Sequence, residues 1–317
     1  MNPIKGLLAR RLVIVMGKGG VGKTVFSAAL ATVTARAGIR TLAMECDPRA
    51  PLLALFGKHP SFDPVAISPG LFSMVLDGRR SLDEYLQIVV PARLILKAVF
   101  ASKLYQYFVQ AAPGLQELMM LGKIYFEIAQ KKPPSARPEL ILLDAPASGQ
   151  ALGLLKMPSA AQDTFGKSIV GRESSNIDRL LHDRQRCAIV LVATPEPLAL
   201  QETIETKRAL SAAGFFTAAI ILNRSSSLAF DEGDVLFFKR NSKLRRHISA
   251  LDHLSSIAIA GLERDRAARE AIAVLTKAGD VPVVQIADFR GLAGTALVGA
   301  IVEALGDQQE RGAAESV

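Results

Sequence analysis

The sequence contains no tryptophan and only two cysteines, Cys46 and Cys187. The two are far apart and neither belongs to a C-x-x-C pair, so they indicate neither a disulfide framework nor a cysteine metal site. A reducing, cytoplasmic compartment is the simpler expectation. The pattern of a secretory leader is also missing, because the short basic segment 1–11 runs directly into the first predicted strand. These absences exclude the class of small, disulfide-rich secreted proteins.

Long apolar runs are absent as well. No run reaches the roughly 18 residues that a membrane-spanning helix needs. The most apolar stretch, 85–108, is interrupted by Pro91, Arg93, Lys97 and Lys103. We therefore do not expect an integral membrane protein, and peripheral attachment is the form of membrane association that stays open.

Charge is plentiful and unbalanced, with a formal net charge of +8. The densest basic stretch is 239–247, which we interpret as the solvated face of a helix. The alternative is a patch that binds nucleic acid or a membrane. Aromatic side chains that stack on bases do not interleave with these basic residues, so we do not expect nucleic acid as a partner.

Short apolar runs rich in β-branched residues alternate with longer segments of helical periodicity, such as 24–37 and 198–213. Continuous apolar runs are typical of strands buried on both faces of a parallel sheet. The alternation predicts an α/β fold with a doubly wound, mostly parallel sheet. The predicted strands are 11–16, 40–44, 139–143, 188–193, 218–222 and 281–286.

One interval breaks this rhythm. About ninety residues separate the second and third predicted strands, which is too many for a single crossover helix. Helix-forming residues with apolar positions at helical spacing fill 81–130, and a proline-rich segment, 131–138, follows them. We predict a single domain over 1–317 that carries a helical insert at about 76–132.

Residues 17–24, GKGGVGKT, match the phosphate-binding pattern G-x-x-x-x-G-K-[S/T] between a predicted strand and a predicted helix. Glycines let backbone N–H groups turn toward an anion, and the N-terminus of the helix adds its positive end. Lys23 would reach the β- and γ-phosphates, and the Thr24 hydroxyl would bind Mg²⁺. The predicted nucleotide-binding residues of the loop are Gly17, Lys18, Gly19, Gly20, Val21, Gly22, Lys23, Thr24 and Val25.

Two aspartates follow predicted strands. Asp47 lies after the second strand, at the edge where ligands bind in open α/β sheets, and it could orient the attacking water. The rival interpretation is an N-cap for a helix that begins at Pro48. Asp144 ends the third strand, where it would hold Mg²⁺ through water, with a structural turn residue as the alternative. Thr24, Asp47 and Asp144 are the candidate Mg²⁺ residues.

Other candidates lie after strands. The small-residue loop 145–150 suits a segment that senses the γ-phosphate, with Gly149 allowing a backbone N–H to approach. Asn223 is placed to hydrogen-bond an adenine edge, although asparagine at a strand end is also an ordinary turn residue. Residues 287–289, which include Phe289, could form the other wall of the base pocket.

Lys18 is not needed to surround a phosphate. The motif K-G-G-x-G-K-[S/T] resembles the deviant Walker A loop of dimeric SIMIBI-type ATPases, which include the nitrogenase iron protein, the MinD/ParA positioning ATPases and the ArsA/guided-entry ATPases. This resemblance implies that Lys18 reaches across a dimer to the partner's nucleotide and acts as an arginine finger does. The alternative is an exposed loop lysine.

Further segments resemble the ArsA/guided-entry family over most of the chain. The resemblance implies an ATP-hydrolysing dimer, either a homodimer or a heterodimer with a paralogue, that uses ATP and Mg²⁺. It also implies that nucleotide state controls the binding of a hydrophobic-helix client or a membrane-protein partner. The matching segments are GKGGVGKT at 17–24, CDP at 46–48, PGLQEL at 113–118, DAPASGQALGLLKMP at 144–158 and TPEPLALQET at 194–203.

The chain also departs from that family. Gln150 stands where many members have histidine, and the missing cysteine motifs argue against arsenite or zinc binding. An apolar stripe in the insert could line a client groove, or it could be the core of the insert itself. This stripe comprises Met119, Met120, Leu121, Ile124 and Phe126.

Two alternative functions are a MinD/ParA-like positioning ATPase and a non-hydrolysing partner subunit. A membrane-targeting MinD relative would end in a basic amphipathic helix, whereas 292–305 contains no Lys or Arg. The presence of Lys18, Lys23, Asp47 and Asp144 argues against the non-hydrolysing subunit.

Overall fold

The computed structural model describes residues 3–90, 99–129, 137–225, 233, 236–237, 240 and 249–314. Its centre is an eight-stranded sheet with the order β3-β4-β2-β5-β1-β6-β7-β8, in which every pairing is parallel except β3 with β4. The predicted doubly wound α/β fold is therefore confirmed. The strands are β1 Leu12–Gly17, β2 Thr41–Glu45, β3 Val65–Ser68, β4 Leu71–Val75, β5 Leu140–Asp144, β6 Cys187–Ala193, β7 Thr217–Ser225 and β8 Val283–Ala287.

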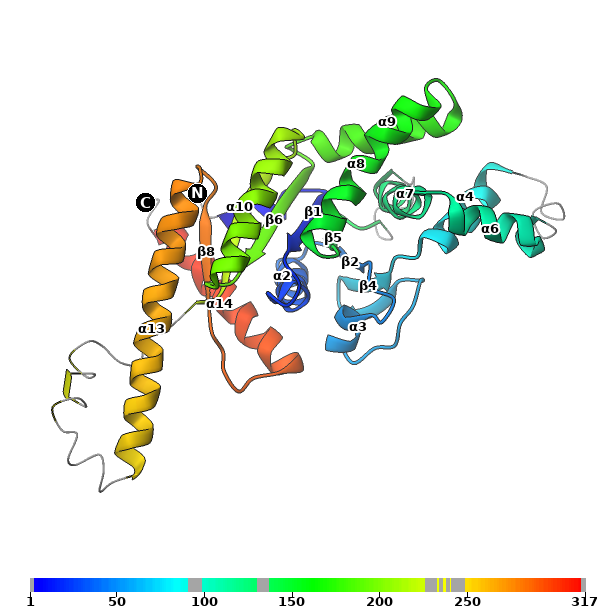
Figure 1. Ribbon diagram of the computed structural model, residues 1–317. Coiled ribbons are helices and arrows are strands. Elements are labelled where there is room, and N and C mark those ends of the chain that lie inside the picture. The colour runs from blue at the N-terminus through cyan, green and yellow to red at the C-terminus, as the bar shows by residue number, and fades with distance from the viewer. Residues whose placement is uncertain are drawn as a thin grey trace.

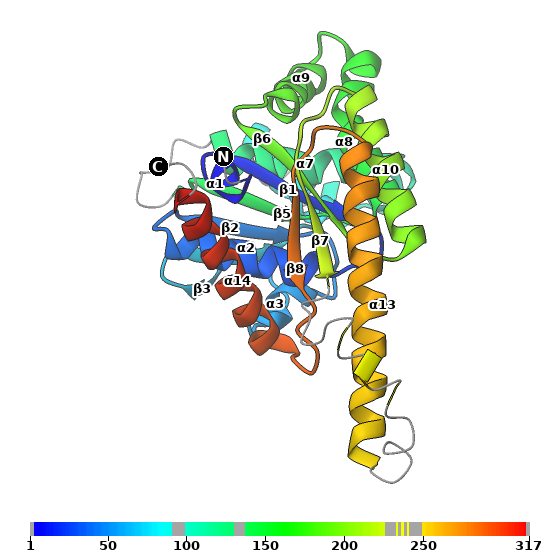
Figure 2. The same ribbon diagram turned by 90° about the vertical axis from the view of Figure 1, so that its left-hand side faces the viewer.

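Helices cover both faces of the sheet (Figures 1 and 2). One layer contains α1, α2 and α14, and the opposite layer contains α7 to α10 and α13. No helix within the described ranges combines the length and the apolar character that a membrane span requires. The helices are α1 Pro3–Leu8, α2 Lys23–Arg36, α3 Pro51–Leu55, α4 Gly78–Val89, α6 Lys103–Ala111, α7 Leu115–Ala129, α8 Ser148–Phe165, α9 Ile169–His182, α10 Pro197–Ala212, α13 Ser249–Lys277 and α14 Gly294–Ala314.

Strand β1 lies between β5 and β6, and its side chains alternate between the two layers. Leu12 and Ile14 join the core cluster under α7 to α10, whereas Val13 and Val15 join the cluster under α2 and α14. Apolar side chains on both faces explain why the sequence of β1 is a continuous apolar run. The run ends at Gly17, so the phosphate-binding loop begins at the carboxyl edge of the sheet.

Helices α4, α6 and α7 lie in the interval where the insert is predicted, and they pack with helices that follow β5. Helix α4 lies against α7, and α7 contacts both α8 and α9. The packing is close, since a Cβ on Gly114 would meet Met157 Sδ of α8 at 2.3 Å. The helical subdomain is therefore larger in space than the inserted segment, because α8 and α9 complete it (Figure 1).

The longest helix, α13, runs well beyond the edge of the sheet (Figures 1 and 2). Its contacts with the rest of the described chain are with α10, β7 and β8. The sequence did not indicate this projecting helix. Of the basic stretch 239–247, only Arg240 belongs to the described residues, and the predicted connector 131–138 lies outside them up to residue 136.

Two sequence-based expectations about local structure were wrong or incomplete. Strands β3 and β4 were missed because β3 is short and its exposure alternates, as in an edge hairpin. The predicted helix at Pro48 does not begin there. Helix α3 begins at Pro51 after a turn closed by the bond from Ala50 N–H to Asp47 C=O, 2.9 Å.

Candidate active site

The loop between β1 and α2 requires glycine at two positions. Gly17 has φ +154°, and a Cβ there would lie 2.3 Å from the carbonyl oxygen of Val192. Gly22 has φ +94°, and a Cβ there would lie 2.4 Å from Asn223 Nδ2. Because no other residue fits these conformations and contacts, the backbone itself explains the glycines of the sequence motif.

Asn223 of β7 holds the loop from two strands away, because β6 lies between β1 and β7 in the sheet. Its Nδ2 donates a hydrogen bond to the carbonyl oxygen of Val21 at 2.8 Å, and its side chain is buried. The Nδ2 group that could contact an adenine edge therefore already donates to Val21. Oδ1, in contrast, accepts no hydrogen bond from the described residues. An acceptor at this place suits an exocyclic amino group.

Lys23 lies in the first turn of α2 and is half-buried. Its Nζ donates to the carbonyl oxygen of Lys18 at 3.0 Å, within the same loop. Burial lowers the pKa of Lys23, and nearby Asp144 and Glu202 oppose that effect. Lys18 is half-exposed, and its ammonium has no ion pair with any described residue.

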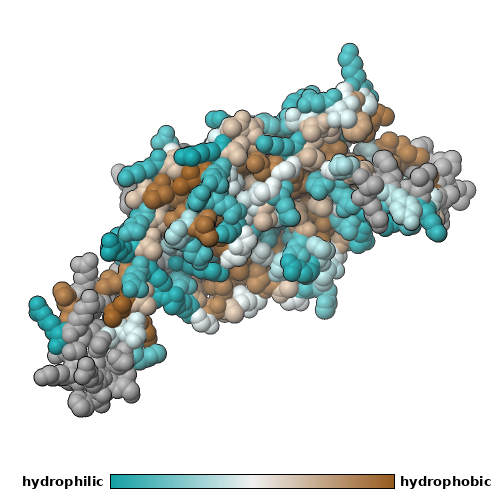
Figure 3. Space-filling model, in the orientation of Figure 1, coloured by the Kyte–Doolittle hydropathy of each residue, from teal (hydrophilic) through white to brown (hydrophobic). Residues whose placement is uncertain are grey.

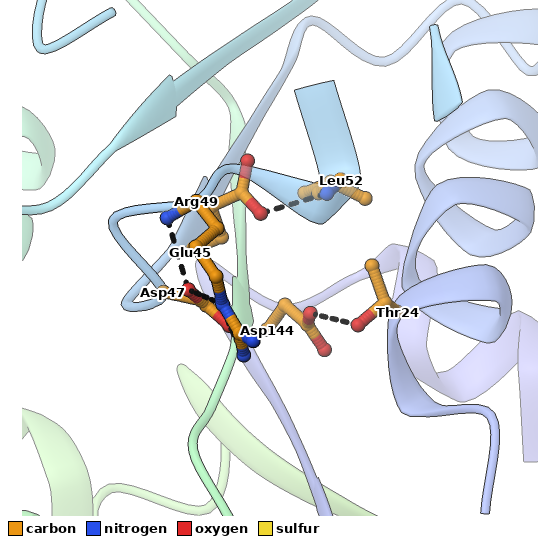
Figure 4. Close-up of polar contacts among 6 residues, drawn as sticks. All are labelled: Thr24, Glu45, Asp47, Arg49, Leu52 and Asp144. Atoms are coloured by element: carbon orange, nitrogen blue, oxygen red, sulfur yellow. Dashed lines mark hydrogen bonds and ion pairs between the residues drawn. The ribbon is translucent and has the colours of Figure 1, made fainter. Parts of the chain in front are cut away.

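Asp144, at the end of β5, accepts hydrogen bonds from two hydroxyls of α2, and Figure 4 shows the one from Thr24. Thr24 Oγ1 donates to Oδ2 at 2.7 Å, and Ser27 Oγ donates to Oδ1 at 3.0 Å. Burial raises the pKa of Asp144, and these two hydrogen bonds act in the opposite direction. The structure thus brings the predicted Thr24 and Asp144 into direct contact.

This pair of oxygens fits Mg²⁺, which prefers hard oxygen ligands and takes most of the others from water and from phosphates. The described part of the chain has no cluster of three or more His, Cys, Asp or Glu side chains that could enclose a metal by itself. Thr24 would bind the ion directly and Asp144 would hold it through water.

Asp47 lies in the turn after β2 and not at a helix N-cap. Its Oδ1 accepts from Arg49 N–H at 2.9 Å, and the Arg49 guanidinium contacts both carboxylate oxygens, with Nη2 2.6 Å from Oδ2. The hydrogen bonds from Arg49 hold the pKa of Asp47 below its ordinary value. Asp47 is therefore charged at neutral pH. It lies at the same edge of the sheet as Asp144 (Figure 4).

Glu45, the last residue of β2, is a buried carboxylate that the sequence analysis did not single out. Its oxygens accept from the N–H groups of Leu52 at 2.7 Å and Leu53 at 3.0 Å, in the first turn of α3. The N-cap residue of α3, Ala50, offers no side-chain acceptor, so Glu45 supplies this function from the sheet. The contact fixes the segment that carries Asp47.

Burial raises the pKa of Glu45 to about 7 in the folded state. The folded protein then binds this proton more tightly than the unfolded chain, so the stabilisation is complete below the unfolded pKa of 4.5 and is lost as pH rises through 7. Relative to Glu45→Gln, the wild-type free energy of unfolding should fall by up to about 1.4 kcal/mol per pH unit in this window. Urea unfolding of wild type and Glu45→Gln from pH 4.5 to 8 measures this pH dependence. A difference in free energy of unfolding that stayed constant over this range would contradict the prediction.

The predicted base-pocket residues Asn223 and Phe289 come together, and Val25 of the predicted loop lies with them. Val25, Asn223 and Phe289 line one cavity of about 220 Å³, next to Gly22. Gly149 is exposed in the first turn of α8, so the predicted loop 145–150 is a loop only to Ala147. A Cβ added to Gly149 would meet no atom within 4 Å.

A second cavity, of about 310 Å³, lies among α4, α7 and α9. Its lining is mostly apolar and includes Met119 and Phe126 from the predicted stripe. Leu121 and Ile124 belong instead to the buried core, and Met120 packs against that core. Part of the stripe is therefore core, while Met119 and Phe126 line the cavity.

The geometry can be compared with known proteins. The family model described as anion-transporting ATPase matches residues 10–174, from just before β1 into α9. The chain belongs to the anion-transporting ATPase family. This confirms the resemblance that rested on the loop at 17–24 and on the segments that follow Asp47 and Asp144.

Curated relatives of this family member are distant. ATPase BagA of Mycobacterium tuberculosis is 29% identical over 224 residues, which cover 68% of this chain and 65% of that protein. ATPase ASNA1 homolog 1 of Paramecium tetraurelia is 28% identical over 160 residues, which cover 50% of this chain and 46% of that protein. The chain thus spans less than two thirds of the length of these relatives.

Three site residues of this anion-transporting ATPase family member escaped the sequence analysis: Ser27, Glu45 and Arg49. Ser27 had a readable signal, since it lies one helical turn after Thr24 and residues i and i+3 share a face. Glu45 and Arg49 had none, because their contacts depend on the turn at 47–50 and on the position of α3.

Proposed function

We propose that this chain is an ATP hydrolase that works as a dimer and couples its nucleotide state to the binding of a client segment or membrane partner. The observation that carries the proposal is the contact of Thr24 with Asp144 beneath a glycine loop at the N-terminus of α2. Family membership and relatives that are named ATPases support it.

In the proposed mechanism the loop backbone and the positive end of α2 bind the phosphates. Lys23 leaves the carbonyl of Lys18 for the β- and γ-phosphate oxygens, a stronger charge-assisted contact. Mg²⁺, when bound, neutralises charge that develops on the phosphates. Thr24 and Asp144 position that ion, and Asp47 orients the water in line with the γ-phosphate.

Lys18 completes the site of the partner subunit in this proposal. Its half-exposed ammonium has no counter-ion among the described residues, so no internal ion pair has to be broken before it contacts a phosphate. A second subunit, either another copy or a paralogue, would contribute the equivalent lysine. Hydrolysis then depends on dimer closure, which gives nucleotide state a mechanical output.

The client site in this proposal is the cavity among α4, α7 and α9. It is apolar where Met119, Phe126 and Ile88 line it, and hydrophobic surface continues at the outer end of the helical subdomain in Figure 3. Exposed side chains in that region include Phe165 and Ile169. Methionine and aromatic side chains adapt to varied apolar segments.

The test traps the closed state with Asp47→Asn, which should bind ATP normally and lose at least about 100-fold in turnover, because the water loses its orienting carboxylate. ATP-dependent capture with this variant, followed by mass spectrometry, identifies what is bound. Unchanged hydrolysis would remove Asp47 from the mechanism. If the variant instead bound a membrane surface or a component of a chromosome-positioning system, and captured no apolar segment, the result would support the MinD/ParA-like alternative.

A pocket-filling variant makes the client test specific. A Cβ on Gly122 of α7 meets no atom within 4 Å, and Gly122 lines the cavity, so the side chain of Gly122→Leu would occupy cavity space. Gly299→Leu on α14 is the matched control, since its Cβ position is equally open and lies across the sheet. Loss of client in the Gly122 variant alone, with ATP turnover retained by both, is the expected result.

A further inference from the structure

The carboxylate of Asp47 is saturated by its own neighbour. Arg49 makes four hydrogen bonds to it: N–H to Oδ1 at 2.9 Å, Nε to Oδ1 at 3.0 Å, Nε to Oδ2 at 3.2 Å and Nη2 to Oδ2 at 2.6 Å. A carboxylate offers about four acceptor positions. As it lies here, Asp47 therefore has no acceptor position left to orient a water molecule.

The turn that holds this contact is built into the chain. Asp47, Pro48, Arg49 and Ala50 form a turn closed by the bond from Ala50 N–H to Asp47 C=O, and proline is favoured at its second position. Ala50 adopts the left-handed conformation, φ 55°, and is fully buried. Glu45 holds the start of α3 directly after it. The backbone of Asp47 and Arg49 is thus fixed, while the guanidinium is free to move.

The guanidinium itself is held weakly. The Arg49 side chain is 87% exposed, and its hydrogen bonds within the described part of the chain are those to Asp47. Exposed ion pairs contribute little to stability and are screened by salt. The contact can therefore open at small cost, as a reversible restraint would require.

We propose that Arg49 is a positioning residue that restrains Asp47 until the site closes, so that ATP is not hydrolysed before a partner is bound. This inference rests on the proposed role of Asp47. Opening the contact returns the carboxylate acceptors to the water and leaves the Arg49 guanidinium, which lies against Asp47 in Figure 4, exposed to solvent. The restraint sets the basal rate and does not touch the bound nucleotide.

The test compares steady-state ATP hydrolysis by the full chain without client for wild type, Arg49→Ala and Arg49→Lys. We expect kcat to rise about two- to fivefold in Arg49→Ala with KM unchanged, because the pair is exposed and weak. Lysine keeps the charge but cannot bind both oxygens as a planar fork does, so its rate should be intermediate. An unchanged or lower kcat in Arg49→Ala would overturn the proposal.

Two further comparisons exclude a merely structural effect. Higher ionic strength should raise the wild-type kcat by more than it raises that of Arg49→Ala, since only the wild type has the pair to screen; an equal response would contradict the restraint. Arg36→Ala is the control, because it removes another exposed ion pair, Arg36 with Glu303 at 2.8 Å, and should leave kcat unchanged.

The double variant Asp47→Asn/Arg49→Ala separates this inference from the proposed function. If Arg49 acts through Asp47, the double variant is as slow as Asp47→Asn alone. Turnover that survives Asp47→Asn would refute the role of Asp47 and the restraint together. A slow Asp47→Asn combined with an unaltered Arg49→Ala would refute the restraint only.

Discussion

Lys23→Ala is expected to lower the affinity for ATP by at least about 100-fold. In the proposed site this lysine contacts both the β- and γ-phosphates, and each charge-assisted hydrogen bond of this kind is worth about 1.5–3 kcal/mol. In the structure its Nζ rests on the carbonyl of Lys18, 3.0 Å away, and is already half-buried beside Asp144. Little reorganisation is needed for it to meet a phosphate.

Isothermal titration with ATP and Mg²⁺ measures this loss. Lys58→Ala is the matched control, because Lys58 is exposed and lies after α3, away from the loop. The variant should unfold at the same temperature as the wild type, since the single hydrogen bond that it loses is within a surface loop. Tight ATP binding by the folded Lys23 variant would refute the phosphate-binding assignment.

Lys18→Ala is expected to bind ATP nearly as the wild type does and to lose about 10³-fold or more in turnover. A cation supplied across an interface to the transferred phosphate typically contributes a factor of about 10³–10⁵. The side chain of Lys18 makes no ion pair with the described residues, so its removal breaks no internal contact.

Mixing experiments locate the effect in the partner. Lys18→Ala and Lys23→Ala subunits, each inactive alone, should regain activity when combined, because one site then has a nucleotide-binding loop and a partner lysine. Sedimentation with and without nucleotide establishes that the two subunits associate. Full turnover by a strictly monomeric protein, or by Lys18→Ala alone, would refute the role across the dimer.

Much of the fold could be predicted from the sequence because parallel strands that are buried on both faces leave continuous apolar runs. Strands β1, β5 and β6 were each placed within one residue of both observed ends, and the interval before β5 correctly indicated extra helices. Strands β3 and β4 were missed. The edge strand β3 has four residues of alternating exposure, and β4, although mostly buried, has only five residues, so both short patterns are hard to separate from loop sequence.

The candidate site likewise contains residues that could be predicted from the sequence and contacts that could not. Gly17, Gly22, Lys23 and Thr24 could be assigned from sequence because phosphate binding uses consecutive backbone groups, and their spacing is set within one strand–loop–helix unit. Asp144 was found because it ends a recognisable strand. Asn223 was found because it follows the predicted strand 218–222, although β7 continues to Ser225, and its bond to Val21 C=O, which joins residues 202 positions apart, was not foreseen.

The sequence by itself therefore determined the class of this protein: a parallel α/β sheet with a phosphate loop, because local periodicity and local spacing encode both. Only the tertiary structure decided which carboxylates touch which partners. The carboxylate of Glu45 accepts a hydrogen bond from the first turn of α3, and that of Asp144 accepts from two hydroxyls of α2. The carboxylate of Asp47 accepts from Arg49. Such contacts depend on where a turn closes and how a helix begins, and those follow from packing between distant segments.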